Sequence, residues 1–376
     1  MCMDEKRPLE YRIFNDDAED AVGSIYVCMI KDIVKNIGAS FVIYGENKVG
    51  FLKSTSYKRG TLVALQLKKK GDEDKAPLFT DELSLTGMYT VVKNSDKNFA
   101  ISHKITGDKR KEIKELYGSF FSDLEYGITL RTNSVGASQG EVLKEADELA
   151  GRMEEILFTA DKRTCGTVLY NEDNEWIRHC LKADASSLEK IITDDTDIYD
   201  LIKKGPVSKF CSINPEIRIE LYNDRLLPLD KLYSIKTGLD EALKAKVWLK
   251  SGGFLYIEHT RALTTIDVNT GKNIKNTDKE TTFFNCNMEA TEEIARQIRL
   301  RNLSGIIIVD YINMEEERHL NQVTGYLKQL IGADPVKTTV HDVTALSLVE
   351  LTRQKELKPL KDQIEMLDRI SEVANG

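Results

Sequence analysis

Two stretches toward the C-terminus decide the fold, GGFLYIEHTRALTTIDVN (252–269) and SGIIIVDYINM (304–314). Both are rich in apolar and β-branched residues, which indicates strands that bury much of their surface. Helical patterns lie between the two stretches, at 290–301, and after the second, at 318–330. Together with a strand at VWLK (247–250), this alternation predicts an α/β layer with a largely buried sheet.

An aspartate closes each of the two apolar strands, Asp267 after Ala-Leu-Thr-Thr-Ile and Asp310 after Gly-Ile-Ile-Ile-Val. Ligands of α/β sheets gather at the carboxyl ends of strands. A carboxylate there is costly unless it is hydrogen-bonded or holds a cation. Two of them on neighbouring strands predict a site for Mg²⁺, with Mn²⁺ also suitable.

Asn269 follows Asp267 by two residues, so strand alternation predicts that both side chains share one face of the sheet. The amide is then placed to orient a phosphate or the first carboxylate. The residues alone also allow a structural alternative, in which both aspartates cap strand ends by accepting hydrogen bonds from loop amides.

The N-terminal half is patterned differently. Alternating residues at 22–54, a strand at 61–67 and another near 89–93 predict a small OB-type barrel. Residues 140–157 predict an amphipathic helix, 184–203 solvated helices and turns, and the stretch from 351 a charged helical tail.

Length and composition limit the class of protein. The 376 residues suggest two to four modules, and the polar N-terminus without a long apolar run predicts a cytoplasmic location and no membrane partner. Six scattered cysteines without a CxxC pair predict no zinc site. A net charge of −8 leaves a nucleic-acid partner open, because binding needs a local basic track rather than a basic total.

The stretches around both aspartates, with FFNCNMEATEEIARQIRLRN (283–302) and VELTRQK (349–355), resemble the catalytic-domain signature of the RNase E/G family. The resemblance runs over roughly residues 20–360 and weakens between about 180 and 240. It implies a DNase I-like nuclease domain in which Asp267 and Asp310 bind Mg²⁺ and single-stranded RNA is hydrolysed to leave a 5′-phosphate. Asn269 corresponds to the family's companion asparagine.

The segment GASFVIYGENKVGFLK (38–53) resembles the family's S1-type RNA-binding barrel. The resemblance implies that Phe41 and Phe51 contact RNA, since exposed aromatic rings on an OB sheet stack on unpaired bases. It also implies that Lys75 faces RNA. Without the resemblance, a phenylalanine in a strand is more often a core residue.

The segment EYGITLRTNSVGAS (125–138) resembles the family's 5′-monophosphate sensor, with Arg131 and Thr132 as the phosphate-binding pair. A guanidinium binds phosphate bidentately, and a hydroxyl completes the cradle. Lys104 and Lys337 stand where the family often has further basic residues near this pocket.

Several positions depart from the family pattern. Arg261 stands where the family normally has an acid, Glu258 replaces an Asp, and Asn313 replaces a second Asp. A cation near the metal site either weakens Mg²⁺ binding or binds the phosphate. The basic residues in ARQIRLRN (295–302) have two readings, since cations favour a helix C-terminus and also bind RNA.

The family's CPxC zinc-link and small C-terminal domain are not found in the sequence, so the oligomeric state is left open. The RNase H-like module interrupted by the barrel is expected to be reduced. The predicted division, in an α+β and α/β multidomain chain, is 1–19 and 178–242 for that module, 20–93 for the S1-type OB-fold barrel, 94–177 for the 5′-sensor region and 243–376 for the DNase I-like domain with a helical tail.

The predicted function is a metal-dependent endoribonuclease that cleaves single-stranded RNA, favours 5′-monophosphorylated substrates and acts in RNA processing or decay. One alternative is a non-catalytic RNA-binding protein with the same fold, and another is a broader metal-dependent phosphoesterase. The intact aspartate pair favours the nuclease over the first. The barrel and the Arg-Thr pair favour it over the second.

Overall fold

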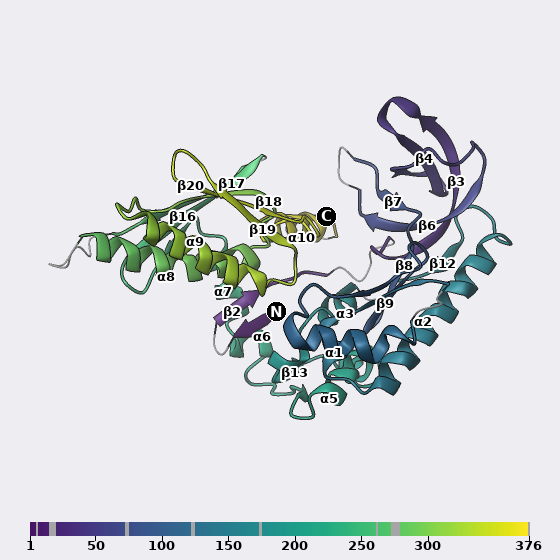
Figure 1. Ribbon diagram of the computed structural model, residues 1–376, viewed down its shortest axis with the longest axis horizontal. Helices are drawn as coiled ribbons and strands as arrows, with labels where there is room; N and C mark the ends of the chain where they lie inside the picture. The colour runs from purple at the N-terminus through teal and green to yellow at the C-terminus, as the bar shows by residue number, and fades with distance from the viewer. Residues whose placement is uncertain are drawn as a thin grey trace. The chain divides into compact units, whose positions relative to one another are not determined.

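The structure is a computed structural model that describes residues 1–4, 7–14, 20–71, 75–121, 125–172, 175–260, 262–271 and 279–374. The chain forms two compact units. The first consists of Met1–Ile13 and Asp224–Gly376, and the second of Phe14–Asn223. Figure 1 shows the helices and strands of both units.

A closed barrel begins the second unit. Within the described residues it consists of β3 (Ile25–Val34), β4 (Ala39–Gly45), β5 (Lys48–Leu52), β7 (Leu78–Thr80) and β6 (Leu62–Lys69), in that spatial order. Pairing of β3 with β6 closes it, and β12 (Val168–Tyr170) adds to β3 from outside. Inward side chains such as Tyr26, Val42, Leu65 and Phe79 fill the interior. The mixed α/β architecture with an OB-like barrel is therefore confirmed.

The strand predicted near 89–93 forms as β9 (Thr90–Lys93), but it is not part of the barrel. It belongs to a sheet ordered β10 (Phe99–Ile101), β11 (Gly127–Leu130), β9 and β8 (Ser84–Thr86) in the described chain. The barrel takes the short strand β7 in its place. The reason is packing, because Val92 lies in the same core as residues of the long helix α2 (Gln139–Ala160), separate from the barrel core.

Helix α2 confirms the amphipathic pattern at 140–157 and begins at a capping box in which Ser138 and Glu141 bond reciprocally. Its buried stripe, which includes Val142, Ala146 and Met153, packs on the sheet. Among its described residues this unit also contains α1 (Gly107–Gly118), α3 (Glu175–Cys180), β13 (Lys190–Thr193), α4 (Thr196–Lys204), α5 (Phe210–Ile213) and β14 (Arg218–Leu221).

The first unit is organised around a mixed sheet. Its strand order in the described residues is β15 (Lys246–Trp248), β16 (Phe254–His259), β17 (Leu263–Asn269), β18 (Gly305–Asp310), β20 (Leu348–Arg353) and β19 (Thr338–Val343). Strands β17 and β18 run parallel, joined by the crossover that contains α8 (Lys279–Leu300), and the other pairs are antiparallel. Helix α9 (Glu317–Gly332) connects β18 to β19.

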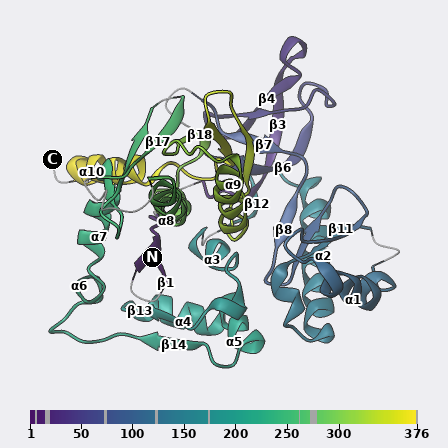
Figure 2. The same ribbon diagram turned by 60° about the vertical axis from the view of Figure 1, so that its left-hand side comes forward.

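One face of this sheet is covered and the other is exposed. Helices α8 and α9 lie side by side on the covered face, as Figures 1 and 2 show. There Ile266, Val309 and Leu351 pack against Ile294 and Leu327 of the helices. Burial alternates along β16 and β17, so every second side chain points to the uncovered face. The prediction of a largely buried sheet was therefore wrong for half of its surface.

Short elements complete the first unit: β1 (Cys2–Asp4), β2 (Arg7–Glu10), α6 (Leu229–Leu232), α7 (Ile235–Ala242) and α10 (Leu360–Ala374). Tyr11, Ala242, Leu300 and Leu360 form a small core among them. The tail predicted as helical from 351 first completes β20, and its helix begins at Leu360. Among the residues described, no helix is long and apolar enough to cross a membrane.

Candidate active site

Asp267 and Asp310 are brought together by the parallel pairing of β17 and β18. They are partners in the strand register, near the carboxyl ends of both strands. Their neighbours Ile266 and Val309 are 1% and 0% exposed on the covered face, so both carboxylates point to the open face. The prediction that the two carboxylates lie at the ends of neighbouring strands is confirmed as geometry, and their role stays a prediction.

Asn269 shares this face, as strand alternation predicted. Its Nδ2 donates a hydrogen bond to Oδ2 of Asp267 across 2.8 Å. That bond fixes the orientation of the Asp267 carboxylate. It leaves the amide oxygen of Asn269 able to serve as a further ligand for a cation. Burial, and then the charge of Asp267, raise the pKa of the Asp310 carboxyl above its ordinary value.

The chain after Asp310 is held by helix α8. Asn287 is fully buried, and its side chain donates to the Ile312 carbonyl (2.8 Å) and accepts from the Ile312 amide (3.1 Å). One turn later, the hydroxyl of Thr291 lies 3.0 Å from that of Tyr311, also buried. These contacts fix the segment beside Asp310 to the covered core. Asn287 and Thr291 are therefore positioning residues for the carboxylate.

The turn before β16 fits closely against Asn269. Gly252 has φ +89°, a conformation that glycine adopts without strain. A Cβ on Gly253 would lie 2.8 Å from the backbone oxygen of Asn269. Gly253 therefore permits the close approach of Asn269, and Gly252 forms the turn that precedes it.

The donor set fits a hard divalent cation. It consists of two carboxylates and one amide oxygen, the oxygen ligands that Mg²⁺ takes while keeping several waters. Within the described residues neither carboxylate forms an ion pair, and no cluster of three or more His, Cys, Asp or Glu side chains gathers as a metal site. Burial and then the charge of Asp267 raise the pKa of Asp310, and a bound cation would offset both effects.

The positions that depart from the family pattern are partly described. Glu258 lies exposed on β16, paired with Thr265, and Asn313 is exposed after β18. Arg261 lies outside the described residues.

The arginines at the end of α8 have structural partners. Arg296 donates to the Pro8 carbonyl (2.8 Å) and to Glu293, and Arg299 donates to Glu10 (3.0 Å). Arg301 is 8% exposed and donates to the Lys244 carbonyl across 2.7 Å. These bonds tie the helix to its own unit and favour the structural reading of ARQIRLRN.

Phe41 and Phe51 are partners on β4 and β5, with ring centroids 5.9 Å apart and an edge-to-face angle of 72°. Both are half-buried and lie outside the barrel core, which contains Val42 and Leu52 on the alternate positions. Lys75 is exposed just before β7. The structure therefore places two rings together on the outer face of the barrel.

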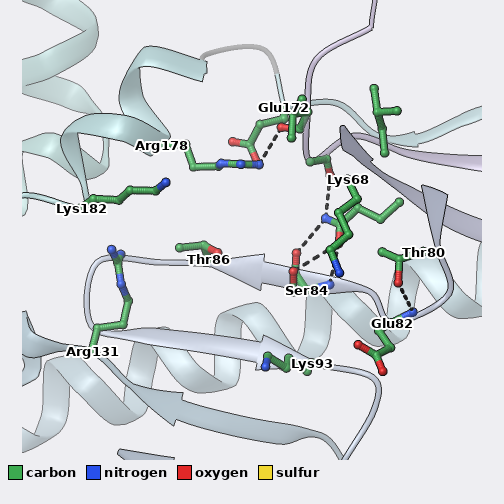
Figure 3. A pocket seen from close by; sticks show the side chains of 14 residues that line it. Lys68, Thr80, Glu82, Ser84, Thr86, Lys93, Arg131, Glu172, Arg178 and Lys182 are labelled. Carbon is green, nitrogen blue, oxygen red and sulfur yellow. Dashed lines mark hydrogen bonds between the residues drawn. The ribbon is translucent and has the colours of Figure 1, made fainter. Parts of the chain in front are cut away.

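Arg131 lines a cavity of about 310 Å³ in the second unit (Figure 3). Its guanidinium donates to the Gly87 carbonyl and, across 2.9 Å, to the Leu181 carbonyl. Burial lowers its pKa, and the charge of Glu145 opposes this. Figure 3 shows the side chains of Arg131 and Lys182 pointing toward the same space. The cavity has five basic and two acidic side chains: Lys68, Lys93, Arg131, Arg178, Lys182, Glu82 and Glu172.

The other residues predicted for the 5′-phosphate are not part of this lining. Thr132 begins a 3-10 turn directly after Arg131 and is half-buried. Lys104 is exposed in the turn before α1. Lys337 belongs to the first unit, where it is exposed before β19. The sequence did not reveal the other four cations of the cavity, because Lys68 and Lys93 lie far from Arg178 and Lys182 in the chain and meet them only by folding.

Comparisons with known proteins add independent information. The sequence matches the model of the "Ribonuclease E/G family" over residues 84–356. A putative ribonuclease E of Buchnera aphidicola subsp. Baizongia pistaciae is 30% identical over 96% of this chain and 92% of that protein. Ribonuclease G of Escherichia coli is 29% identical over 92% of this chain and 75% of its own length. Ribonuclease E of Buchnera aphidicola subsp. Schizaphis graminum is 29% identical, and the match spans 38% of that longer protein.

Proposed function

The chain belongs to the ribonuclease E/G family and is an endoribonuclease, and we propose that it hydrolyses single-stranded RNA at a centre formed by Asp267, Asn269 and Asp310. The observation that carries this proposal is the in-register pair of carboxylates on the open face of the sheet. Such a pair is costly unless a cation and a substrate use it.

We further propose that Asp267 and Asp310 hold Mg²⁺, or Mn²⁺, with the Asn269 oxygen beside them. When bound, such an ion supplies Lewis acidity, which polarises a phosphoryl oxygen and acidifies water. Neighbouring residues of the chain orient the two carboxylates. Asn269 fixes the orientation of the Asp267 carboxylate through its 2.8 Å bond, and Asn287 fixes the backbone that follows Asp310.

The barrel is the proposed entry surface for RNA. Phe41 and Phe51 offer an edge-to-face ring pair on its outer face, and an unpaired base of any identity can stack on such rings. Lys75, exposed beside the short strand β7, supplies a cation for the phosphate backbone.

The cavity around Arg131 is the proposed site for the 5′-monophosphate. Its excess of basic side chains favours a dianionic phosphate. Because Arg131 already donates to two carbonyl groups, it holds the local backbone together. Its positive charge also attracts the phosphate. Arg178 and Lys182 then share the phosphate with it, and Thr132, Lys104 and Lys337 remain predicted contributors.

The finer domain assignment is also a proposal. Residues 243–376 would be the DNase I-like nuclease domain, 20–93 the S1-type barrel, 94–177 the sensor region, and 1–19 with 178–242 the reduced RNase H-like module. A cytoplasmic place of action accompanies it.

The test uses short single-stranded RNA with either a 5′-monophosphate or a 5′-hydroxyl, incubated with the protein in Mg²⁺ or in EDTA. The proposal predicts internal cleavage in Mg²⁺, none in EDTA, and faster cleavage of the monophosphate. Equal cleavage rates for the 5′-monophosphate and 5′-hydroxyl RNA would contradict the proposed role of Arg131 in binding the 5′-phosphate. Undiminished cleavage in EDTA would show that cleavage does not require a metal ion.

A further inference from the structure

Three aromatic side chains gather on the open face of the nuclease sheet. Trp248 on β15 is 64% exposed and Tyr256 on β16 is 42% exposed, with Phe254 between them. The centroids of Trp248 and Phe254 lie 5.4 Å apart, and those of Phe254 and Tyr256 lie 5.6 Å apart. We call these three residues the aromatic platform. Contiguous exposed apolar patches often mark binding surfaces, whereas single exposed apolar residues are ordinary.

A cation is held by the platform itself. The Nζ atom of Lys246 lies 3.9 Å from the ring centroid of Trp248 and 3.8 Å from that of Phe254. In the part of the chain that the structure describes, Lys246 forms no ion pair with a carboxylate. The rings therefore hold its position without neutralising its charge. A charge held in this way remains available for a phosphate.

The platform is in register with the active site. Lys246 pairs with Tyr256, Tyr256 with Asp267, and Asp267 with Asp310, which forms one row across four strands. The next row contains Trp248, Phe254 and Asn269. Partners in adjacent strands share one face, so the platform and the carboxylates open onto the same surface. Two strand spacings, roughly 10 Å, separate Lys246 from Asp267.

We infer that the aromatic platform and Lys246 form a base-stacking subsite for the RNA nucleotide next to the scissile phosphate. The inference rests on the proposed function, because it places the bond to be cut at Asp267 and Asp310. An unpaired base stacks on Trp248, the more exposed of the two outer rings, and Lys246 contacts the phosphate that follows it. Stacking accepts every base, so the subsite selects single-stranded RNA rather than a sequence.

Charge favours this occupant over an apolar protein surface. Two carboxylates repel an RNA backbone, and Lys246 supplies a positive charge on the same row. The platform offers ring faces beside a cation, the combination that binds single strands. A second copy of the chain is the competing occupant, and the test separates the two.

Fluorescence gives the direct readout, because the chain has two tryptophans, Trp176 and Trp248. A Trp176→Phe, Asp310→Asn protein reports on Trp248 alone and does not consume substrate. Titration with a 12-nucleotide single-stranded RNA is expected to quench this emission. A single abasic nucleotide, moved along the strand, is expected to reduce the quenching at one position. Should Trp176→Phe not fold, the difference between Asp310→Asn and Asp310→Asn, Trp248→Phe gives the same quantity.

Cleavage kinetics give the second readout. Replacing Trp248 by Ala is expected to lower kcat/KM about tenfold, the effect of one lost stacked base. Trp248→Phe should retain most of the activity, and an abasic substrate should cost the Ala variant little more. Phe158→Ala is the matched control, since Phe158 is 65% exposed and has Lys162 Nζ 3.3 Å from its ring centroid. It should cleave like wild type.

The results separate the two proposals. If wild type cleaves RNA while Trp248→Ala cleaves equally fast and Trp248 emission ignores RNA, the subsite is overturned and the nuclease stands. A change of sedimentation in Trp248→Ala with unchanged cleavage would likewise overturn it, in favour of a second copy. If wild type cuts nothing but RNA quenches Trp248 and an abasic nucleotide weakens the quenching, the platform stands as a base-stacking RNA-binding site, and both the cleavage centre and the platform's place beside a scissile phosphate fail.

Discussion

Asp267 and Asp310 are register partners on the parallel strands β17 and β18, and the charge of the first contributes to the raised pKa of the second. Two like charges are held together on a sheet whose other face packs into a hydrophobic core. Folding alone gives no reason for this pairing, because repulsion between like charges opposes stability.

Removing one of these charges is expected to separate stability from function. Asp310→Asn should leave the melting temperature in EDTA unchanged or higher than that of wild type, because the repulsion from Asp267 is gone. It should also lose the rise that Mg²⁺ gives wild type, since binding to the folded state stabilises it. Thermal unfolding with and without Mg²⁺ measures both. A variant that melts lower in EDTA yet still responds fully to Mg²⁺ would contradict this account.

Asn287 is expected to matter for both folding and rate. Asn287→Ala leaves the half-buried amide and carbonyl of Ile312 without these partners, which should cost about 1–3 kcal/mol in the free energy of unfolding. Displacement of the chain beside Asp310 should lower kcat while KM changes little. Denaturant unfolding and steady-state cleavage test the two effects. Asn321→Ala, at an exposed position on α9, is the control and should be neutral.

The ring pair on the barrel is expected to serve RNA rather than stability. Phe41→Ala should weaken binding of a single-stranded RNA by about 1–3 kcal/mol, the contribution of one stacked base. Its unfolding should change far less than that of Phe79→Ala, whose ring is 1% exposed in the barrel core. Fluorescence anisotropy measures the RNA affinity, and urea unfolding measures the free energy of unfolding. If Phe41→Ala binds RNA like wild type, Phe41 has no role in binding.

Glu172, in the basic cavity, should make stability depend on pH. Burial raises the pKa of its carboxyl above 4.5, so the folded state holds this proton more tightly than the unfolded chain does. Its contribution is therefore most favourable below pH 4.5 and falls as the pH rises toward the folded pKa. Glu172→Gln should remove this fall and make the protein more stable than wild type at neutral pH.

Urea unfolding of Glu172→Gln and wild type at several pH values measures this difference. Glu189→Gln, at an exposed position, serves as the control. A difference between Glu172→Gln and wild type that stays constant from pH 4 to 8 would show that Glu172 does not titrate differently on folding.

Local patterns were sufficient for much of the fold. Apolar runs ending in Asp267 and Asp310 predicted the two strands, and period-two alternation predicted the shared face of Asn269. Patterns do not choose a partner for a strand, so the sheet containing β9 was missed. They also misread the open face, because Ile306 ends up 48% exposed in a strand that reads as buried. The roles of the site residues stay predictions.

Tertiary convergence explains what could not be predicted. The cations of the cavity are spread from Lys68 to Lys182, and only the fold brings them together. Trp248 and Tyr256 lie in strands of the sheet that was predicted to be largely buried, since nothing local shows which face the helices will cover, yet both are exposed. Sequence predicts which residues share a face, whereas the packing of α8 and α9 decides which face stays open.

The most direct test of the central claim is the single-turnover cleavage rate of a short 5′-monophosphorylated single-stranded RNA in Mg²⁺. Wild type, Asp310→Asn and Asp342→Asn are compared, the last replacing an exposed aspartate on β19 of the same sheet. The account predicts that Asp310→Asn binds the RNA but cleaves it at least about 10²-fold more slowly, while Asp342→Asn cleaves like wild type. Equal cleavage by Asp310→Asn and wild type would contradict the assignment of Asp267 and Asp310 as the hydrolytic centre.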